Sequence, residues 1–299
     1  MRTAAFIAAL AVVPLTQAEV IQRGRYLMGT VCEVAAARPE QIERAFAEAK
    51  RIEGMLSTWT GESELARVNR GEIEPSDELN ALLSKALLWS KRTDRAFDPR
   101  IKPLVDLWKT REEGALPSAA AIARARDAAD SARDFEEGGF GKGYALDRML
   151  ALLDGEALIN FGGQVIVRGT HEITVADPAD RRKPAIAFTI ENASLSTSSG
   201  SEKTFEVDGR RFSHILDPRT GEALPPRGSV SVISDDALTA DILSTALYVI
   251  GEDDGLRWAD AHGVAAIFIN PSNHVRLSAK ARERARGLEL LDRNFSMKD

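Results

Sequence analysis

The chain has 299 residues, of which 44% are hydrophobic and 28% are charged, so it can bury a sizeable core and is unlike a disordered protein. Its formal net charge of −6 argues against a general nucleic-acid binder, which would carry a basic stripe. No apolar run reaches the roughly 18 to 20 residues that a membrane-spanning helix needs, so we expect a protein that does not span a membrane.

The N-terminal segment, residues 1–18, has the order of a secretory signal peptide. Arg2 comes first, an apolar stretch from Ala4 to Val13 follows, and a small-residue ending makes cleavage after Ala18 plausible. The alternative is a short buried N-terminal helix. We therefore expect a periplasmic protein whose mature part, residues 19–299, is one unit. Cys32, the only cysteine, cannot form an intramolecular disulfide, and we expect it to be buried.

The predicted elements mix strands and helices without strict alternation. In chain order they are a strand at 26–36 with Gly29 as a possible bulge, helices at 39–57, 80–93 and 118–133, strands at 158–169, 172–176 and 185–190, a hairpin of 204–207 with 211–215, a strand at 229–233 and a helix at about 236–250. This mixture predicts an α+β fold, with mixed, mainly antiparallel sheets flanked by helices in a single compact unit.

Three polar side chains interrupt the apolar helix expected near residues 236–250. Asp241 and Thr245 stand four residues apart and therefore share a helix face, and Ser244 can reach the edge of the same spot. A carboxylate with hydroxyls offers hard oxygen ligands, which suit Mg²⁺ better than zinc. The alternative is an aspartate favoured by the helix dipole, with Thr245 bonded back to a carbonyl. Spacing alone favours this second interpretation.

A second motif is glycine-rich and reads G-G-F-G-K-G-Y-A-L-D, residues 138–147. Its glycines would let the backbone approach a ligand closely. It is not a Walker A loop, because Gly143 rather than Ser or Thr follows Lys142, and it lacks the spacing of the Rossmann fingerprint. The alternative is a plain turn that enters a helix near Tyr144.

A third motif, S-H-I-L-D-P-R-T-G at residues 213–221, joins a strand end to turn chemistry. His214 lies inside the expected strand, where it is a base, a phosphate partner or a core histidine, and spacing favours the core histidine. Upstream, L-S-T-S-S-G-S at residues 195–201 presents hydroxyls that suit either a phosphate or a turn.

Taken in order, these segments resemble the FAD:protein FMN transferase family, also called the ApbE family. The matching segments are M-G-T (28–30), L-S-T-W-T-G-E-S-E-L-A-R-V-N (56–69), A-F-D-P-R-I-K-P-L-V-D-L-W (96–108), G-K-G-Y-A-L-D (141–147), N-F-G-G (160–163), S-T-S-S-G-S (196–201), S-H-I-L-D-P-R-T-G (213–221) and A-D-I-L-S-T-A-L (240–247). They run from residue 28 to about residue 251 in one consistent order. With this resemblance, the metal interpretation of Asp241 becomes the favoured one.

The resemblance implies a role for each matching position. Residues 19–299 would form a flavin transferase domain, and Asp241 and His214 are the candidates for the catalytic base. Mg²⁺ would be held by the Asp241 carboxylate, the Thr245 hydroxyl, Ser244 as a further candidate and the carbonyl of Gly139. The residues implied to contact FAD are Met28, Trp59, Ala96, Phe97, Asp98, Glu136, Lys142 and Leu216.

The chain departs from the family's pattern at three places. Glu136 stands where many members have Asp, and Gln164 follows the two glycines of N-F-G-G where Asp is frequent. The family often continues P-L-V-x-L with W-G-F-G, whereas this chain has Trp108, Lys109 and Thr110 followed by Arg111.

The implied reaction is Mg²⁺-dependent transfer of FMN from FAD to a Thr or Ser hydroxyl of an acceptor protein, with a phosphodiester as the product and AMP as the leaving group. FAD and the acceptor protein are thus the expected partners. One alternative is hydrolysis of FAD to FMN and AMP in the same site. Another is a periplasmic flavin-binding protein without catalysis.

Overall fold

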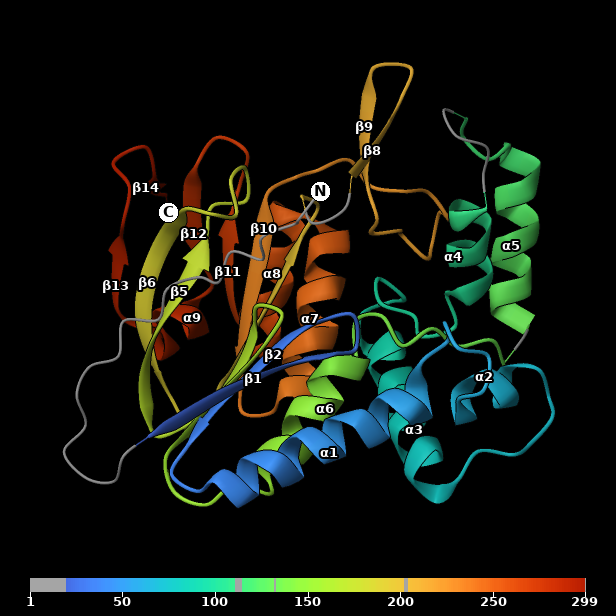
Figure 1. Cartoon of the computed structure of the whole chain (residues 1–299). Coiled ribbons are helices and arrows are strands. Elements are labelled where there is room, and N and C mark those ends of the chain that lie inside the picture. The colour runs from blue at the N-terminus through green and yellow to red at the C-terminus, as the bar shows by residue number, and fades with distance from the viewer. Residues whose placement is uncertain (1–19, 111–114, 132, 202–203, 299) are drawn as a thin grey trace, which may run out of the picture.

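The computed structural model describes residues 20–110, 115–131, 133–201 and 204–298 (Figure 1). The expected signal peptide, residues 1–18, lies outside these ranges. Within them, none of the helices combines the length and the apolar character that crossing a bilayer requires.

The largest sheet in the described part of the chain has nine strands. Adjacent strands in it are antiparallel, except for one parallel pair at an edge. Their spatial order is β1 (Ile21–Leu27), β2 (Thr30–Ala36), β3 (Ala157–Phe161), β4 (Gln164–Arg168), β7 (Ser194–Ser199), β10 (Ser229–Ser234), β11 (Ala265–Ile269), β12 (His274–Leu277) and β14 (Ser296–Met297). The parallel pair is β12 with β14.

Two smaller sheets accompany it. One is formed by β13 (Arg286–Leu290), β6 (Pro184–Glu191) and β5 (Thr170–Ala176), and its buried Val, Ile and Phe side chains share a core with β7 and β11. The other is the hairpin of β8 (Thr204–Val207) and β9 (Arg210–Ser213), which projects from the body in Figure 1.

The helices pack mainly against one another and against the large sheet. They are α1 (Pro39–Leu56), α2 (Glu64–Asn69), α3 (Asp77–Arg92), α4 (Lys102–Lys109), α5 (Ala119–Ser131), α6 (Gly141–Leu150), α7 (Ala237–Ile250), α8 (Glu252–His262) and α9 (Ala279–Arg284). Helix α7 lies against β7 and β10, α6 packs on α7, and α1 packs on α6. Helices α4 and α5 form a separate pair beside the projecting hairpin (Figure 1).

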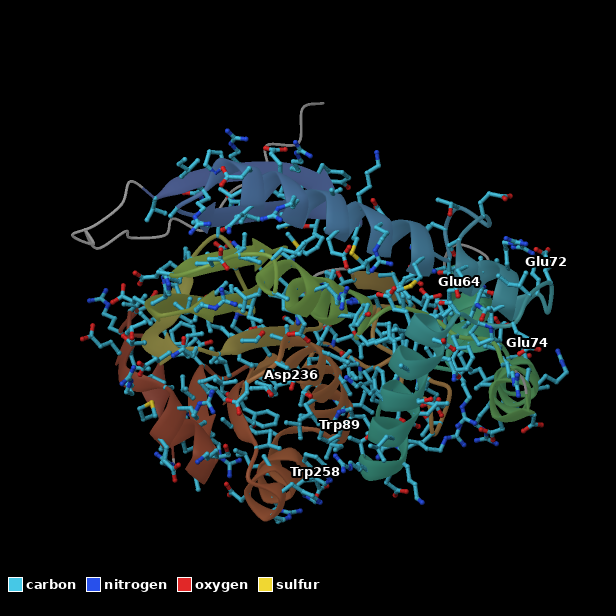
Figure 2. All side chains as sticks on the ribbon, turned by 90° about the horizontal axis from the view of Figure 1, so that it is seen from below. Glu64, Glu72, Glu74, Trp89, Asp236 and Trp258 are labelled. Carbon is cyan, nitrogen blue, oxygen red and sulfur yellow. The ribbon has the colours of Figure 1, made fainter. Side chains whose placement is uncertain are left out.

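Helix α7 carries the predicted metal motif, and its two ends follow from its sequence. Asp236 caps the start, because its side chain accepts a hydrogen bond from the Thr239 N–H at 2.8 Å (Figure 2). Gly251, with a φ of 94°, ends the helix. Most side chains between them are buried, so α7 is the central helix of the fold.

Asp147 of α6 ties the two central helices together. Its carboxylate accepts hydrogen bonds from the N–H groups of Ala237 at 2.7 Å and Leu238 at 3.0 Å, which would otherwise be free at the start of α7. Burial raises the pKa of Asp147 to about 6, although those two hydrogen bonds act in the opposite direction. The position of α7 therefore depends on a carboxyl group that is costly to ionise.

We expect this carboxyl group to make stability fall as pH rises. Its ordinary pKa is 3.8, so between about pH 4 and pH 6 the folded state binds more protons than the unfolded state. Asp147→Asn has no proton to lose, and its free energy of unfolding should fall less over this range than that of the native chain. Urea titrations at several pH values measure the difference, and parallel pH profiles would contradict this role for Asp147.

The predicted α+β fold with mainly antiparallel sheets is confirmed, and so are the helix at 236–250, the hairpin at 204–215 and the burial of Cys32. Two predicted strands are wrong, because each is a hairpin. The chain turns at Met28 and Gly29 between β1 and β2, and at Gly162 and Gly163 between β3 and β4, and all four residues have positive φ. Residues 194–199, whose hydroxyls suit either a phosphate or a turn by sequence, form strand β7. Helix α6 begins at Gly141, three residues before Tyr144.

Candidate active site

Asp241 lies where α7 meets the start of α6. Its side chain is 6% exposed, and its Oδ2 accepts a hydrogen bond from the Gly143 N–H at 2.9 Å. A Cβ on Gly143 would lie 2.4 Å from the Ala237 carbonyl oxygen and 2.8 Å from the Asp241 Cβ. Glycine therefore allows the two helices to touch at this point, and the contact fixes the orientation of the carboxylate.

Thr245 lies one helical turn after Asp241 on α7, and Gly139 of the turn before α6 lies against it. A Cβ on Gly139, whose φ is 89°, would come within 3.0 Å of the Thr245 Oγ1 and 3.4 Å of the Phe97 ring. The Thr245 hydroxyl donates to the Asp241 carbonyl oxygen at 3.2 Å, so its own oxygen keeps lone pairs for another partner. The turn before α6, residues 136–140 (the glycine loop), is thus held directly against the polar face of α7.

Ser244 belongs to a buried hydroxyl network between α7 and β7. Its side chain is fully buried and donates to the Asp241 carbonyl oxygen at 3.0 Å. Its Oγ lies 3.2 Å from that of Ser196 and 2.9 Å from that of Ser198. Ser198 also lies 3.5 Å from the Thr245 Oγ1, so β7 supports both hydroxyls of the helix.

The donor set at this point fits Mg²⁺. The Asp241 carboxylate and the Thr245 hydroxyl are hard oxygen donors, and the missing Cβ of Gly139 leaves room for its main chain beside the Thr245 hydroxyl. Among the described residues, no cluster of three or more His, Cys, Asp or Glu side chains is placed to hold a metal. A site here would combine one carboxylate with neutral oxygens, as Mg²⁺ sites that also bind substrate phosphates do.

Two adjacent acidic residues connect the glycine loop to residues 57–63 (the Trp59 loop). The Thr58 hydroxyl lies 3.1 Å from the Glu136 Oε2 and 2.8 Å from the Glu137 Oε2, and the Thr58 N–H donates to Glu137 at 3.3 Å. Burial raises the pKa of Glu137, and the neighbouring charge of Glu136 adds to this shift. The Trp59 loop is therefore fixed beside the candidate metal site.

Trp59 itself is 73% exposed and lies at the rim of this group. The Lys109 ammonium, at the end of α4, is 4.2 Å from the centre of the Trp59 ring and 3.5 Å from the Glu136 Oε1. Lys142 is half-buried in the first turn of α6, next to the glycine loop.

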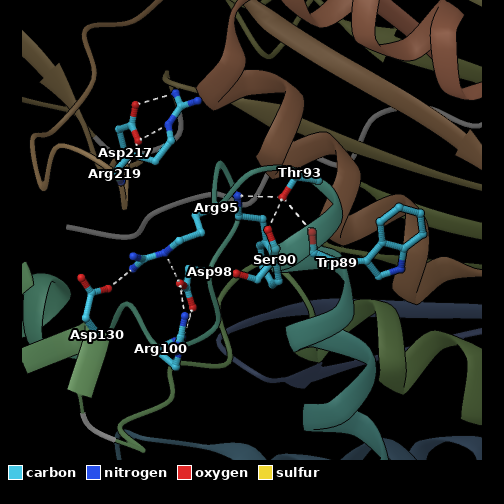
Figure 3. A network of polar contacts seen from close by, with 10 residues as sticks. Trp89, Ser90, Thr93, Arg95, Asp98, Arg100, Asp130, Asp217 and Arg219 are labelled. Atoms are coloured by element: carbon cyan, nitrogen blue, oxygen red, sulfur yellow. Dashed lines mark hydrogen bonds and ion pairs between the residues drawn. The ribbon is translucent and has the colours of Figure 1, made fainter.

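The segment 96–98 is buried and packs against the glycine loop through Phe97. The side chains of Ala96, Phe97 and Asp98 are buried, and the Phe97 ring packs edge-on against Phe140. The Asp98 carboxylate is held by Arg95 at 3.0 Å and by Arg100 at 2.8 Å (Figure 3). Burial opposes ionisation of Asp98, but these hydrogen bonds outweigh it and hold its pKa below the ordinary value.

The remaining predicted residues have different surroundings. His214 is exposed, since β9 ends at Ser213 and the chain bends there, so the preference for a core histidine is wrong. Leu216 is buried against α4 and the hairpin in a small core that also contains Trp108. Met28 sits in the turn between β1 and β2, where its N–H donates to the Glu53 carboxylate at 2.7 Å.

Sequence reasoning missed four residues that the structure places around the site: Thr58, Glu137, Ser198 and Lys109. For Ser198 a signal was present, because Ser196 and Ser198 alternate with other residues and so share one face of a strand. The contacts of Thr58 and Lys109 join segments that are far apart in sequence, and nothing in the local pattern indicates them.

Comparison with known proteins identifies the family of the chain. The ApbE family model matches residues 28–268. The FAD:protein FMN transferase of Klebsiella pneumoniae is 33% identical over 81% of this chain and 85% of its own, and that of Treponema pallidum is 28% identical over 89% of each. The crystal structure of the apo flavinyl transferase ApbE of Pseudomonas stutzeri superposes with a TM-score of 0.78 at 26% identity, over 91% of this chain and 99% of that one.

The ApbE protein of Thermotoga maritima gives a TM-score of 0.82, also at 26% identity, over 90% of this chain and the whole of that one. Both the sequence and the fold are therefore shared along nearly the full length of these relatives. The chain belongs to the ApbE family.

Proposed function

We propose that this chain is a Mg²⁺-dependent FAD:protein FMN transferase that modifies a Thr or Ser hydroxyl of an acceptor protein. The observation that carries the proposal is the placement of Gly139 against the Thr245 hydroxyl, one helical turn from Asp241, in a chain whose relatives are named FAD:protein FMN transferases. A site with one carboxylate and neutral oxygens suits a reaction on a pyrophosphate, which brings its own negative oxygens.

Different residues of the chain would have different roles in this reaction. Asp241 and Thr245 would hold Mg²⁺, which when bound supplies positive charge against the pyrophosphate. The glycine loop would position the phosphates, and Lys142, in the first turn of α6, would favour their negative charge. The exposed Trp59 would lie against the flavin ring.

The bond changes are those of a displacement at phosphorus. The acceptor oxygen attacks the phosphorus of the FMN half of FAD, the bond to the AMP oxygen breaks, and the acceptor proton passes to a base. Asp241 and His214 are the two candidates for this base. His214 is exposed and so accessible to a group carried by another protein, whereas Asp241 is nearly buried.

AMP release tests the proposal. We expect the chain, incubated with FAD and Mg²⁺, to release AMP faster when a flavin-acceptor protein is present, and to stop when a chelator removes the metal. AMP release at one rate with and without acceptor would indicate hydrolysis of FAD. FAD that binds but stays intact with every acceptor tested would indicate a flavin-binding protein and contradict the proposal.

The two hydroxyls of α7 should respond differently to removal. Thr245→Val removes a proposed metal ligand, so we expect the Mg²⁺ concentration for half-maximal AMP release to rise on the order of 10- to 100-fold. Ser244→Ala mainly breaks the network with Ser196 and Ser198, at a cost of about 1 kcal/mol in the free energy of unfolding per lost hydrogen bond. Equal Mg²⁺ dependence in both variants would show that Thr245 is not a ligand.

We also propose that the protein is exported to the periplasm and cleaved after Ala18. The support is the order of Arg2, the apolar stretch and the small-residue ending in the sequence. N-terminal sequencing of the secreted protein tests it, and a mature chain that still begins at Met1 would contradict it.

A further inference from the structure

Lys109 bridges two residues at the rim of the candidate site. Its ammonium stands over the Trp59 ring at 4.2 Å and pairs with the Glu136 carboxylate at 3.5 Å. We infer that Lys109 is a positioning residue for FAD, which holds the Trp59 ring in the orientation that receives the flavin and offsets the charge of Glu136 where the dinucleotide enters. This inference rests on the proposed function.

The backbone that carries Lys109 is anchored by its neighbour. The Trp108 ring donates from Nε1 to the Gly221 carbonyl oxygen at 2.8 Å and packs against Phe205 and Phe212 of the hairpin. The end of α4 is therefore fixed to the core beneath the hairpin. From this fixed point the Lys109 side chain reaches across to the Trp59 loop.

Trp59 needs such a support because its ring is mostly exposed. Thr58 is held by Glu136 and Glu137, but the Trp59 side chain is 73% exposed. A cation over one face of an indole ring is attracted by the ring's quadrupole and restricts the ring's orientation. The opposite face stays available for the aromatic ring of a flavin.

The positive charge of Lys109 also favours binding of FAD. Glu136, Glu137 and Asp241 place three carboxyl groups around the site, while the pyrophosphate of FAD carries two negative charges. Pairing of Lys109 with Glu136 reduces the repulsion that an incoming dinucleotide meets. Because the Lys109 side chain is 41% exposed, this contribution should weaken as salt is added.

The test compares Lys109→Gln, Lys109→Arg and Trp59→Leu with the native chain. Lys109→Gln should raise the KM for FAD about 5- to 10-fold with kcat nearly unchanged, whereas Lys109→Arg, which keeps the cation, should restore most of the loss. In the Trp59→Leu background, Lys109→Gln should have a smaller effect than in the native chain, since the ring it orients is gone and only its pairing with Glu136 is left to lose.

A matched control is available on α3. Arg92 stands over the Trp89 ring at 5.0 Å, and Trp89 lies on that helix, outside the Trp59 loop (Figure 2). Arg92→Gln removes a cation from an indole face as Lys109→Gln does, and it should leave KM unchanged.

A second readout needs no FAD. Acrylamide quenching of tryptophan fluorescence, with Trp59→Leu used to subtract the other rings, should show a more accessible Trp59 in Lys109→Gln. A native chain that binds FAD, together with an unchanged KM and unchanged quenching in Lys109→Gln, would overturn the inference alone. A native chain that neither binds FAD nor releases AMP would overturn the proposed function and this inference with it.

Discussion

Asp241→Asn is expected to lower the rate of AMP release on the order of a thousandfold while the chain stays folded. The amide keeps an oxygen that can accept the Gly143 N–H, so the contact between α6 and α7 survives. It removes the negative charge, however, and with it the only ionised donor of the proposed Mg²⁺ ligands. The loss should therefore appear in activity and metal affinity and scarcely in the free energy of unfolding.

Asp236→Asn is the matched control for this variant. Asp236 precedes the same helix and caps it by accepting the Thr239 N–H, a role that asparagine fills equally well. We expect its activity to remain close to that of the native chain. A fall of less than about tenfold in Asp241→Asn, or a comparable fall in both variants, would contradict the assignment of Asp241 to the metal.

Among glycine-to-alanine changes in α6 and α7, Gly143→Ala should lower the free energy of unfolding the most. The new Cβ would lie 2.4 Å from the Ala237 carbonyl oxygen and 2.8 Å from the Asp241 Cβ, distances that force α6 and α7 apart. Overpacking of this kind costs about 3 kcal/mol in the free energy of unfolding. Because the displaced groups include Asp241 and the N–H that orients it, we also expect activity to be lost.

Gly54→Ala shows what the same change does without a steric conflict. Gly54 lies near the end of α1, and a Cβ there would meet nothing within 4 Å. Alanine should stabilise this position by about 0.5 to 1 kcal/mol, since it is the better helix former. Urea unfolding measures both variants, and a Gly143→Ala chain as stable and active as Gly54→Ala would contradict the close helix contact.

The part of the site that lies on one helix was predictable from the sequence. Asp241 and Thr245 share a face because the α-helix repeats every 3.6 residues, and the structure places Asp241 against Gly143 and Thr245 against Gly139. The likeness of this chain to a known family supplied Gly139, which no periodicity indicates. Local pattern and family resemblance together therefore predicted the residues that we propose to hold the metal.

Other features depended on tertiary contacts that local patterns do not encode. Ser244 is one residue from Thr245, yet its hydroxyl contacts Ser196 and Ser198 of β7, a strand that the sequence did not predict. His214 was expected in the core, but the Ser213 Oγ accepts the Ile215 N–H and the chain bends outward between them. In both cases the surroundings of the side chain are set by how strands pair and where the chain turns.

The contact between Lys109 and Trp59 also depends on tertiary structure that local sequence patterns do not encode. Trp59 and Lys109 are 50 positions apart in the numbering, and they meet because α4 is anchored by Trp108 while Thr58 is held by Glu136 and Glu137. The departure from the family's pattern at Lys109 was visible in the sequence. Its consequence for Trp59 became visible only with the fold.

The most direct measurement of the central claim is the intact mass of an acceptor protein after incubation with the chain, FAD and Mg²⁺. We predict a gain equal to FMN less one water, carried by a Thr or Ser residue, and no gain with Asp241→Asn. An acceptor of unchanged mass, while the same reaction releases AMP and free FMN, would contradict the transferase and leave a hydrolase of FAD.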